Sequence, residues 1–249
     1  MKKVILFGLG LMSILFATTI NIPSDDYPTI QAGINASVDG DTVLVDEGTY
    51  PENLILANEI VLASHAIYDD LDSQWLDNDY INNTIISGTH SGSCLIIKDG
   101  NIEPTIFGFT FQNGTGTNMV VTKCGAFPIR SGGAILLYKA YPTIMYNRFI
   151  NNGFTPGLVG GGDAAANGGA ISHFADDDVE FDEDRDQASQ NNHSSRDIPE
   201  ELNIQNNYFE GNSSGNGENV YSHGYEGDID VSGSVFEDID CETNTVNEF

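Results

Sequence analysis

Two aspartates at alternate positions near the end of the chain have the spacing that most directly suggests chemistry. Asp228 and Asp230 flank Ile229, and alternate side chains of a β-strand point to the same face. Two neighbouring carboxyl groups are the acid and the base that hydrolysis of a glycosidic bond requires. A solvated strand face explains the same pair, so both interpretations stay open at the level of sequence.

A denser group of carboxylates lies earlier in the chain. Asp182, Asp184 and Asp186 have the alternate spacing that opens a calcium-binding loop. Gln187, however, stands at the glycine position of such a loop, and His193 stands where the closing glutamate is needed. No cofactor is firmly implied: calcium is the one candidate, and a plain acidic loop is the alternative.

Four tyrosines are candidates for stacking against the sugar rings of an extended glycan: Tyr138, Tyr141, Tyr146 and Tyr221. Two insertions are expected near them, a Gly- and Ala-rich one over residues 153–167 and an acidic one over residues 175–200. Both interrupt the repeating pattern at what looks like the same register, so we expect them to project from one side. Loops on one face of a repeat protein commonly form its binding surface.

Two histidines occupy similar places after the repeats. His173 follows Ile171 by two residues, and His223 follows Tyr221 by two residues. If they stack on neighbouring coils, they could join a metal site. A solvent-exposed or turn position is the alternative.

The elements that must position these residues are short. Runs of apolar and β-branched residues bounded by Gly, Asn or Pro predict strands over residues 42–45, 53–56, 60–63, 84–87, 94–97 and 105–111, with a turn over 48–51. In residues 29–36 the acidic residues and the proline just before them favour a short helix over a strand. No helical period of useful length follows.

Internal repeats decide the architecture. Residues 131–135 (SGGAI) recur as 167–171 (NGGAI), and an Ile-x-x-Asn-x-Phe motif follows each copy. In stacked coils these motifs predict an internal aromatic column and an asparagine ladder at a bend, formed by Phe111, Phe149, Phe209, Phe236, Asn147 and Asn207. A β-sandwich also has short strands, but it does not repeat one motif along the chain.

The first residues have the layout of a secretory signal peptide. Two lysines precede an apolar run over residues 4–17. The run is shorter than the roughly 20 residues that span a bilayer, so cleavage is favoured over a membrane anchor. We expect a signal peptide over residues 1–19, one domain over 20–249 and a secreted or cell-surface location.

Composition limits the partners. The net charge is −28, which argues against nucleic acid because phosphate binding needs a basic surface. No segment after the leader is apolar enough to cross a membrane. Cys94, Cys124 and Cys241 are odd in number and lack CxxC spacing, so neither a disulfide framework nor a zinc site is expected.

Two stretches resemble a known family. Residues 28–53 contain PTIQAGINAS, DGDTVLV and GTYPEN, and together with 84–88 and 106–114 (IFGFTFQNG) they resemble bacterial right-handed parallel β-helix proteins of the pectin-lyase-like superfamily. With the repeats, the resemblance covers roughly residues 28–236. It implies an all-β, right-handed, single-stranded parallel β-helix with a short N-terminal capping helix, in an extracellular setting.

The resemblance leaves the function open, because this superfamily contains lyases, hydrolases, epimerases and non-catalytic surface proteins. A lyase of this kind needs a Lys or Arg to remove the proton beside a uronate carboxyl group, and carboxylates that hold calcium. Arg148 is the weak candidate for that base, and no carboxylate cluster shares its strand register. We expect a non-catalytic protein that binds extracellular polysaccharide or has a structural or adhesive role. The alternative is a polysaccharide lyase or glycoside hydrolase that acts on acidic glycans.

Overall fold

The computed structural model describes residues 17–71, 73–98, 100–122, 127–153, 166–176, 179–181, 197–237 and 245–248. Asp182, Asp184 and Asp186, the expected calcium ligands, lie outside the described residues. So do most of the expected signal peptide and most of both insertions. In the part of the chain that is described, no helix has the length and apolar character needed to span a bilayer.

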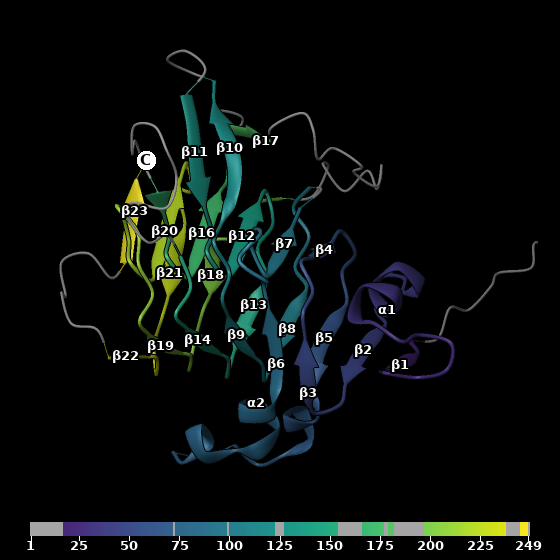
Figure 1. Cartoon of the computed structure of the whole chain (residues 1–249). Helices are drawn as coiled ribbons and strands as arrows, with labels where there is room; N and C mark the ends of the chain where they lie inside the picture. Colours follow the sequence, from purple (N-terminus) through teal and green to yellow (C-terminus); the bar gives the residue numbers. More distant parts are fainter. Residues whose placement is uncertain are drawn as a thin grey trace, which may run out of the picture.

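The chain winds as a parallel β-helix around one core (Figure 1). Successive strands pass from sheet 1 to sheet 2 to sheet 3 before the next coil begins. Sheet 1 contains β1 (Thr19–Ile22), β2 (Thr42–Val45), β5 (Val61–Ser64), β8 (Thr105–Phe107) and β13 (Thr143–Met145). Sheet 2 contains β3 (Gly48–Tyr50), β6 (Thr84–Ser87), β9 (Thr110–Gln112), β14 (Arg148–Ile150), β19 (Tyr208–Glu210) and β22 (Val235–Phe236). Sheet 3 contains β4 (Leu54–Leu56), β7 (Leu95–Ile97), β12 (Ile135–Tyr138), β16 (Ile171–Phe174), β20 (Val220–His223) and β23 (Thr245–Glu248).

Two further strands continue the position of sheet 1. β18 (Glu201–Asn203) pairs in parallel with β21 (Asp228–Asp230), and β18 lies beside β13. We call the connection from sheet 1 to sheet 2 the first corner, that from sheet 2 to sheet 3 the second corner, and that from sheet 3 to the next coil the third corner. The predicted parallel β-helix is confirmed.

An aromatic column runs through the core behind sheet 2. Phe149 pairs with Phe111 on one side and Phe209 on the other. The ring centroids are 5.4 Å and 4.9 Å apart and the planes are nearly parallel. Phe236 extends the column at 4.8 Å from Phe209. In-register parallel strands place identical side chains one above another, which is why one repeated residue becomes a column.

An asparagine ladder follows the first corner. The Asn207 Oδ1 accepts hydrogen bonds from the backbone N and the Nδ2 of Asn147, at 2.9 Å and 3.2 Å. The Nδ2 of Asn207 donates to the backbone oxygens of Ile144 and Gln205. Both asparagines are fully buried. The ladder therefore satisfies turn backbone groups that water cannot reach.

The predicted short helix covers the first coil. The helix α1 (Ile30–Ala36) begins at Thr29, whose side chain accepts a hydrogen bond from the Ala32 N. The Glu52 carboxylate accepts two more from the first turn, from Ile30 N and Gln31 N at 3.0 Å each. The buried side of α1 packs against β1, β2 and β4, so it closes this end of the apolar core.

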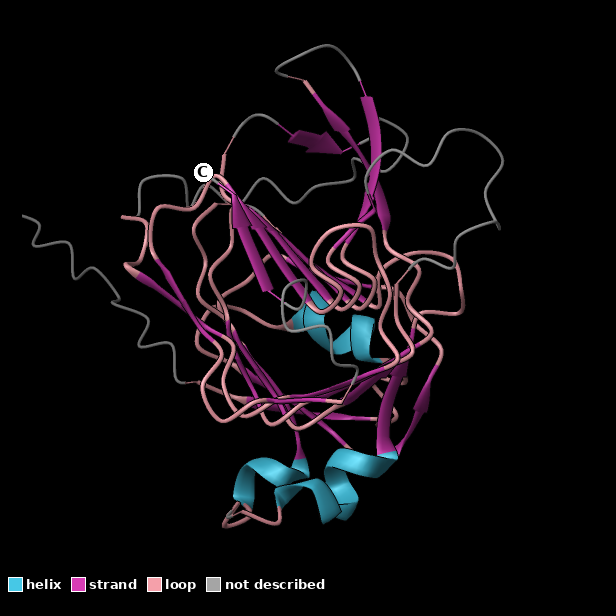
Figure 2. Cartoon of the chain, turned by 90° about the vertical axis from the view of Figure 1, so that its left-hand side faces the viewer, coloured by secondary structure: helices cyan, strands magenta, loops and turns pink. Residues whose placement is uncertain are grey.

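The structure corrects two of the predicted elements. Gly48–Tyr50 is the strand β3, not a turn, because it pairs in parallel with β6. The first corner between β5 and β6 contains helical turns where no helix was predicted: η1 (His65–Tyr68), η2 (Trp75–Asp77) and α2 (Asp79–Asn83). Each has five residues or fewer, too short to produce a periodic pattern. Figure 2 shows them outside the ring of strands.

A hairpin that the repeats do not indicate stands at the second corner. β10 (Thr117–Val121) and β11 (Phe127–Ser131) are antiparallel, and β17 (Val179–Phe181) and β15 (Ala166–Asn167) pair on either side of them. Met119 and Ile129 of the hairpin pack on Leu136, Phe174 and other residues on the outer face of sheet 3. The hairpin thus buries apolar side chains that would otherwise be exposed.

The two insertions do not share a register. The segment 153–167 joins β14 to β16 at the second corner, whereas 175–200 joins β16 to β18 at the third corner. The expectation of a shared register is wrong, because one insertion precedes and the other follows the same strand. The described parts of both insertions nevertheless join one sheet, since β15 pairs with β11 and β17 pairs with β10. The sequence positions were similar relative to the repeat motif but lie on opposite ends of β16.

Candidate functional site

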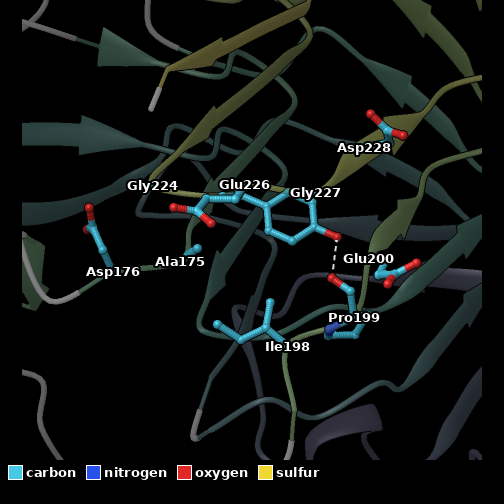
Figure 3. A pocket seen from close by; sticks show the side chains of 10 residues that line it. Ala175, Asp176, Ile198, Pro199, Glu200, Gly224, Glu226, Gly227 and Asp228 are labelled. Atoms are coloured by element: carbon cyan, nitrogen blue, oxygen red, sulfur yellow. Dashed lines mark hydrogen bonds between the residues drawn. The ribbon is translucent and has the colours of Figure 1, made fainter.

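An open pocket of about 600 Å³ lies at the third corner, where two successive coils turn from sheet 3 toward β18 and β21. Ten described residues line it: Ala175, Asp176, Ile198, Pro199, Glu200, Gly224, Tyr225, Glu226, Gly227 and Asp228 (Figure 3). We call it the third-corner pocket. Its volume falls within the range of small-ligand sites in proteins, about 300–1,000 Å³.

The ends of strands position the pocket residues. Asp176 follows β16 and Gly224 follows β20, the next strand of sheet 3. Gly224 has φ +73°, and a Cβ there would lie 2.5 Å from the Asp176 Oδ2. Both the backbone conformation and this close approach require glycine. Glu200 and Asp228 stand where β18 and β21 begin.

Tyr225 forms the inner wall of the pocket. Its ring is buried, and its hydroxyl donates a hydrogen bond of 2.8 Å to the Pro199 backbone oxygen, drawn as a dashed line in Figure 3. Burial, with carboxylates nearby, raises the pKa of Tyr225 to about 12. The hydroxyl is therefore a neutral donor at physiological pH, and it ties the two sides of the pocket together.

The pocket carries strong negative charge. Asp176, Glu200, Glu226 and Asp228 contribute carboxylates to its lining, and no Lys or Arg is among the described residues there. Among the described residues, His223 stands close by, with its Nε2 3.5 Å from the Asp176 Oδ2. The described residues contain no cluster of three or more His, Cys, Asp or Glu that could hold a metal ion. The site suits donors such as hydroxyl or ammonium groups.

The predicted acid–base pair is only partly at this site. Asp228 lines the pocket and is exposed, while Asp230 accepts hydrogen bonds from the Ser232 N at 2.8 Å and from the Gln205 side chain. These hydrogen bonds, with Ser232 first, lower the pKa of Asp230. A group held in its ionised form is poorly suited to act as a general acid.

Arg148 is not brought to the aspartates. It belongs to β14 in sheet 2, where its Nη1 donates to the Asn82 Oδ1 and its guanidinium lies 5.2 Å from the centre of the Tyr208 ring. Asp228 and Asp230 belong to β21. The structure therefore does not bring Arg148 together with Asp228 and Asp230, the candidates for a lyase reaction.

The four tyrosine candidates do not form a stacking surface. Tyr141 is only 3% exposed and Tyr221 only 4%. Tyr146 packs against Trp75 and Phe107, with centroids 5.6 Å and 5.3 Å away. Tyr141 is buried because it packs in the main apolar core, and Tyr221 is buried because it packs in the cluster beneath the hairpin. The expectation that these tyrosines stack against a glycan is corrected for Tyr141 and Tyr221, because both are buried, and the Tyr146 ring is packed against two aromatic side chains.

Tyr138 is the fourth of these tyrosines, and it is half-buried. It packs against the edge of the apolar cluster beneath the hairpin. The Lys139 Nζ lies 5.3 Å from the centre of its ring. One ring face is thus already occupied by protein atoms.

The two histidines also differ from expectation. His173 pairs in register with Ser222, and His223 pairs with Phe174. One residue of offset places them on opposite faces of sheet 3. His173 is fully buried inside the coil, and His223 is partly exposed beside the third-corner pocket. They cannot share a metal ion.

Sequence patterns did not single out Glu200, Tyr225 or Glu226. These residues belong to corners, which vary in length and carry no period. Their one available signal was position, since the residues after β16 and after β20 must meet in neighbouring coils.

Comparison with known proteins adds no assignment. No protein-family model matches the chain, and neither a curated protein nor a solved structure matches it. The fold is therefore established by the strand pairing itself, and the family and the function are matters for proposal.

Proposed function

We propose that this chain is a secreted or cell-surface β-helix of the pectin-lyase-like kind that binds extracellular polysaccharide without transforming it. The observation that carries the proposal is the third-corner pocket, which is open, large enough for a sugar unit and lined by hydrogen-bond acceptors. The expected signal peptide over residues 1–19 and the acidic composition accord with an extracellular setting.

The charge of the pocket selects the class of glycan. Carboxylates accept hydrogen bonds from sugar hydroxyls and pair with ammonium groups, whereas a uronate would place further negative charge beside Glu226 and Asp228. No described lining residue is Lys or Arg to offset that repulsion. The preferred ligands are neutral polysaccharides and amino-sugar polymers.

The catalytic alternative has less support. A lyase or hydrolase acting on acidic glycans would need a cation near the scissile bond or a carboxylic acid kept protonated. Arg148 lies in another sheet, and the pKa of Asp230 is lowered. Neither requirement is met by these candidates.

The test is binding measured by calorimetry with soluble mannan, β-glucan, chitosan oligomers and pectate. We expect chitosan to bind best and calcium-free pectate not to bind. The double variant E226Q/D228N removes two charges while keeping side-chain shape, and we expect it to weaken chitosan binding by about tenfold or more, since each charged hydrogen bond contributes about 1.5–3 kcal/mol.

The matched control is D25N/D26N, which makes the same change in charge at two exposed positions far from the pocket in sequence. It should bind like the parent chain. Parent-like binding by E226Q/D228N, or no binding of any polymer by the parent chain, would overturn the assignment of the pocket. Release of unsaturated products or reducing ends would overturn the non-catalytic reading.

A further inference from the structure

Three aromatic side chains meet on the surface of the first corner, far from the third-corner pocket in the coil. The His65 ring lies 6.2 Å from that of Tyr68 and 5.6 Å from that of Tyr80, measured between centroids. Tyr68 is 69% exposed and Tyr80 is 37% exposed, which makes them two of the few large exposed apolar side chains among the described residues. We call this group the aromatic patch.

A small rigid core holds the patch in place. Ala66, Trp75 and Ile81 are buried together beneath the helical turns. The Ser64 side chain accepts from the Ala66 N at the start of η1, and the Asn78 side chain accepts from the Ile81 N at the start of α2. Tyr68 and Tyr80 thus lie on turns whose ends are capped, so binding a ligand costs little conformational entropy of the backbone.

Polar groups surround the rings. The His65 Nε2 lies 2.8 Å from the Asp46 Oδ1, and the Asn83 Nδ2 donates to the Glu47 Oε1 at 3.0 Å. Each carboxylate has a second oxygen that can accept from a ligand. The described residues of this surface segment, 65–71 and 73–83, contain no Lys or Arg.

We propose that the aromatic patch is a second polysaccharide-binding surface, on which the apolar C–H faces of neutral or amino-sugar pyranose units stack. Exposed rings favour a ligand with an apolar face, and the adjacent acceptors favour one edged with hydroxyl or ammonium groups. The Asp46 and Glu47 carboxylates beside the rings disfavour uronates and sulfated glycans. The ligand class rests on the proposed function, but the patch itself does not depend on the third-corner pocket.

The chain contains a built-in reporter for this surface. Trp75 is the single tryptophan, it is 8% exposed, and it lies in the core beneath the patch. A glycan that stacks on Tyr68 and Tyr80 should change the Trp75 fluorescence. A glycan bound only at the third-corner pocket should leave it unchanged.

The experiment titrates the full chain with mannan, β-glucan and chitosan oligomers while following Trp75 fluorescence. We expect at least one of them to give a saturable change. The variant Y68A/Y80A should weaken that binding tenfold or more, whereas Y68F/Y80F, which keeps both ring faces, should stay within about threefold of the parent chain. Circular dichroism checks that both variants keep the fold. We expect them to, because both substituted positions are exposed.

The outcomes at the two sites are separable. Loss of the fluorescence response in Y68A/Y80A but not in E226Q/D228N supports the patch, whether or not the pocket binds glycan. Parent-like affinity of Y68A/Y80A, or no fluorescence change with any polymer, overturns the patch and leaves the calorimetric test of the pocket untouched.

Discussion

At the scale of single residues, His173 is the most unusual titratable group in the described core. It is fully buried, its Nδ1 lies 3.1 Å from the Ser222 Oγ, and its ring meets Tyr141 and Tyr225 edge-on. Its Nε2 has no hydrogen-bond partner. Burial lowers the pKa of His173 to about 3 from 6.5, because a charged imidazolium would lose its hydration there.

The shifted pKa makes stability depend on pH with a definite sign. Above pH 6.5 the imidazole is neutral in both the folded and the unfolded chain. As the pH falls from about 6.5 toward 3, the unfolded chain takes up a proton that the folded chain refuses, so the free energy of unfolding falls. Near pH 3 the free energy of unfolding has fallen by on the order of 4 kcal/mol because of His173 alone.

The variant H173F should remove this dependence. Phenylalanine can keep the edge contacts with Tyr141 and Tyr225, so we expect it to flatten the loss of stability between pH 6.5 and 4 relative to the parent chain. Urea unfolding at a series of pH values measures this. H90N, at an exposed position whose φ of 57° Asn tolerates, should keep the parent slope. Equal slopes for H173F and the parent would contradict the prediction.

At the scale of elements, the first corner shows how the coil turns tightly. The residues before Asn147 and Asn207 have a positive φ, 56° at Tyr146 and 52° at Asn206. Gly108 and Gly233 stand at the same place in the neighbouring coils, with φ of 80° and 69°. Two non-glycine residues are held in this conformation by the hydrogen bonds that follow. The asparagine ladder therefore stabilises a backbone shape that most residues disfavour.

The variant N207D tests the ladder. Aspartate has the same shape, but it replaces the two N–H donors that face the carbonyls of Ile144 and Gln205 with a carboxylate oxygen. We expect a loss of about 3 kcal/mol or more in the free energy of unfolding, from unpaired buried groups and a buried charge. In N35D the exposed Oδ1 still accepts from Gln31, so this control should change little. A similar loss in both variants would refute the role of the ladder.

At the scale of the whole molecule, the negative charge opposes compaction. The net charge is −28, and two like charges 4 Å apart repel by about 1 kcal/mol even in water. The coil holds because its apolar and asparagine columns continue through successive turns. Among the described side chains of Asp, Glu, Lys and Arg, those of Asp41 and Lys98 are buried and the others are at least partly exposed, where salt can screen them.

Salt should therefore stabilise the fold at neutral pH. Raising NaCl from about 10 mM to about 0.5 M shortens the screening length from roughly 30 Å to a few Å, and we expect the free energy of unfolding to rise by on the order of 1 kcal/mol. Chemical unfolding in urea measures it. Near the calculated isoelectric point, about 4.1, the gain should largely vanish. A decrease with salt at neutral pH would contradict this account.

The sequence by itself determined the coil and its columns. Phe recurs at one inward register in the coils of Phe111, Phe149, Phe209 and Phe236, and Asn recurs at the corner register of Asn147 and Asn207. Burial against the neighbouring coil favours similar side chains at the same register, so these residues carry a visible period. The helix at residues 30–36 was predictable from the residues that precede it. The helical turns of the first corner and the hairpin at the second corner have no such signal in the sequence.

Only the tertiary structure decided which residues meet at the surface. Corners vary in length and have no period, so nothing in the sequence brings Asp176 together with Glu226, or His65 with Tyr80. The alternation of apolar and polar residues along a strand does not show which outer faces a hairpin covers. The burial of Tyr221 beneath the hairpin could therefore not be predicted. The coil follows from local, repeated burial, whereas the sites depend on how unrepeated corners stack in space.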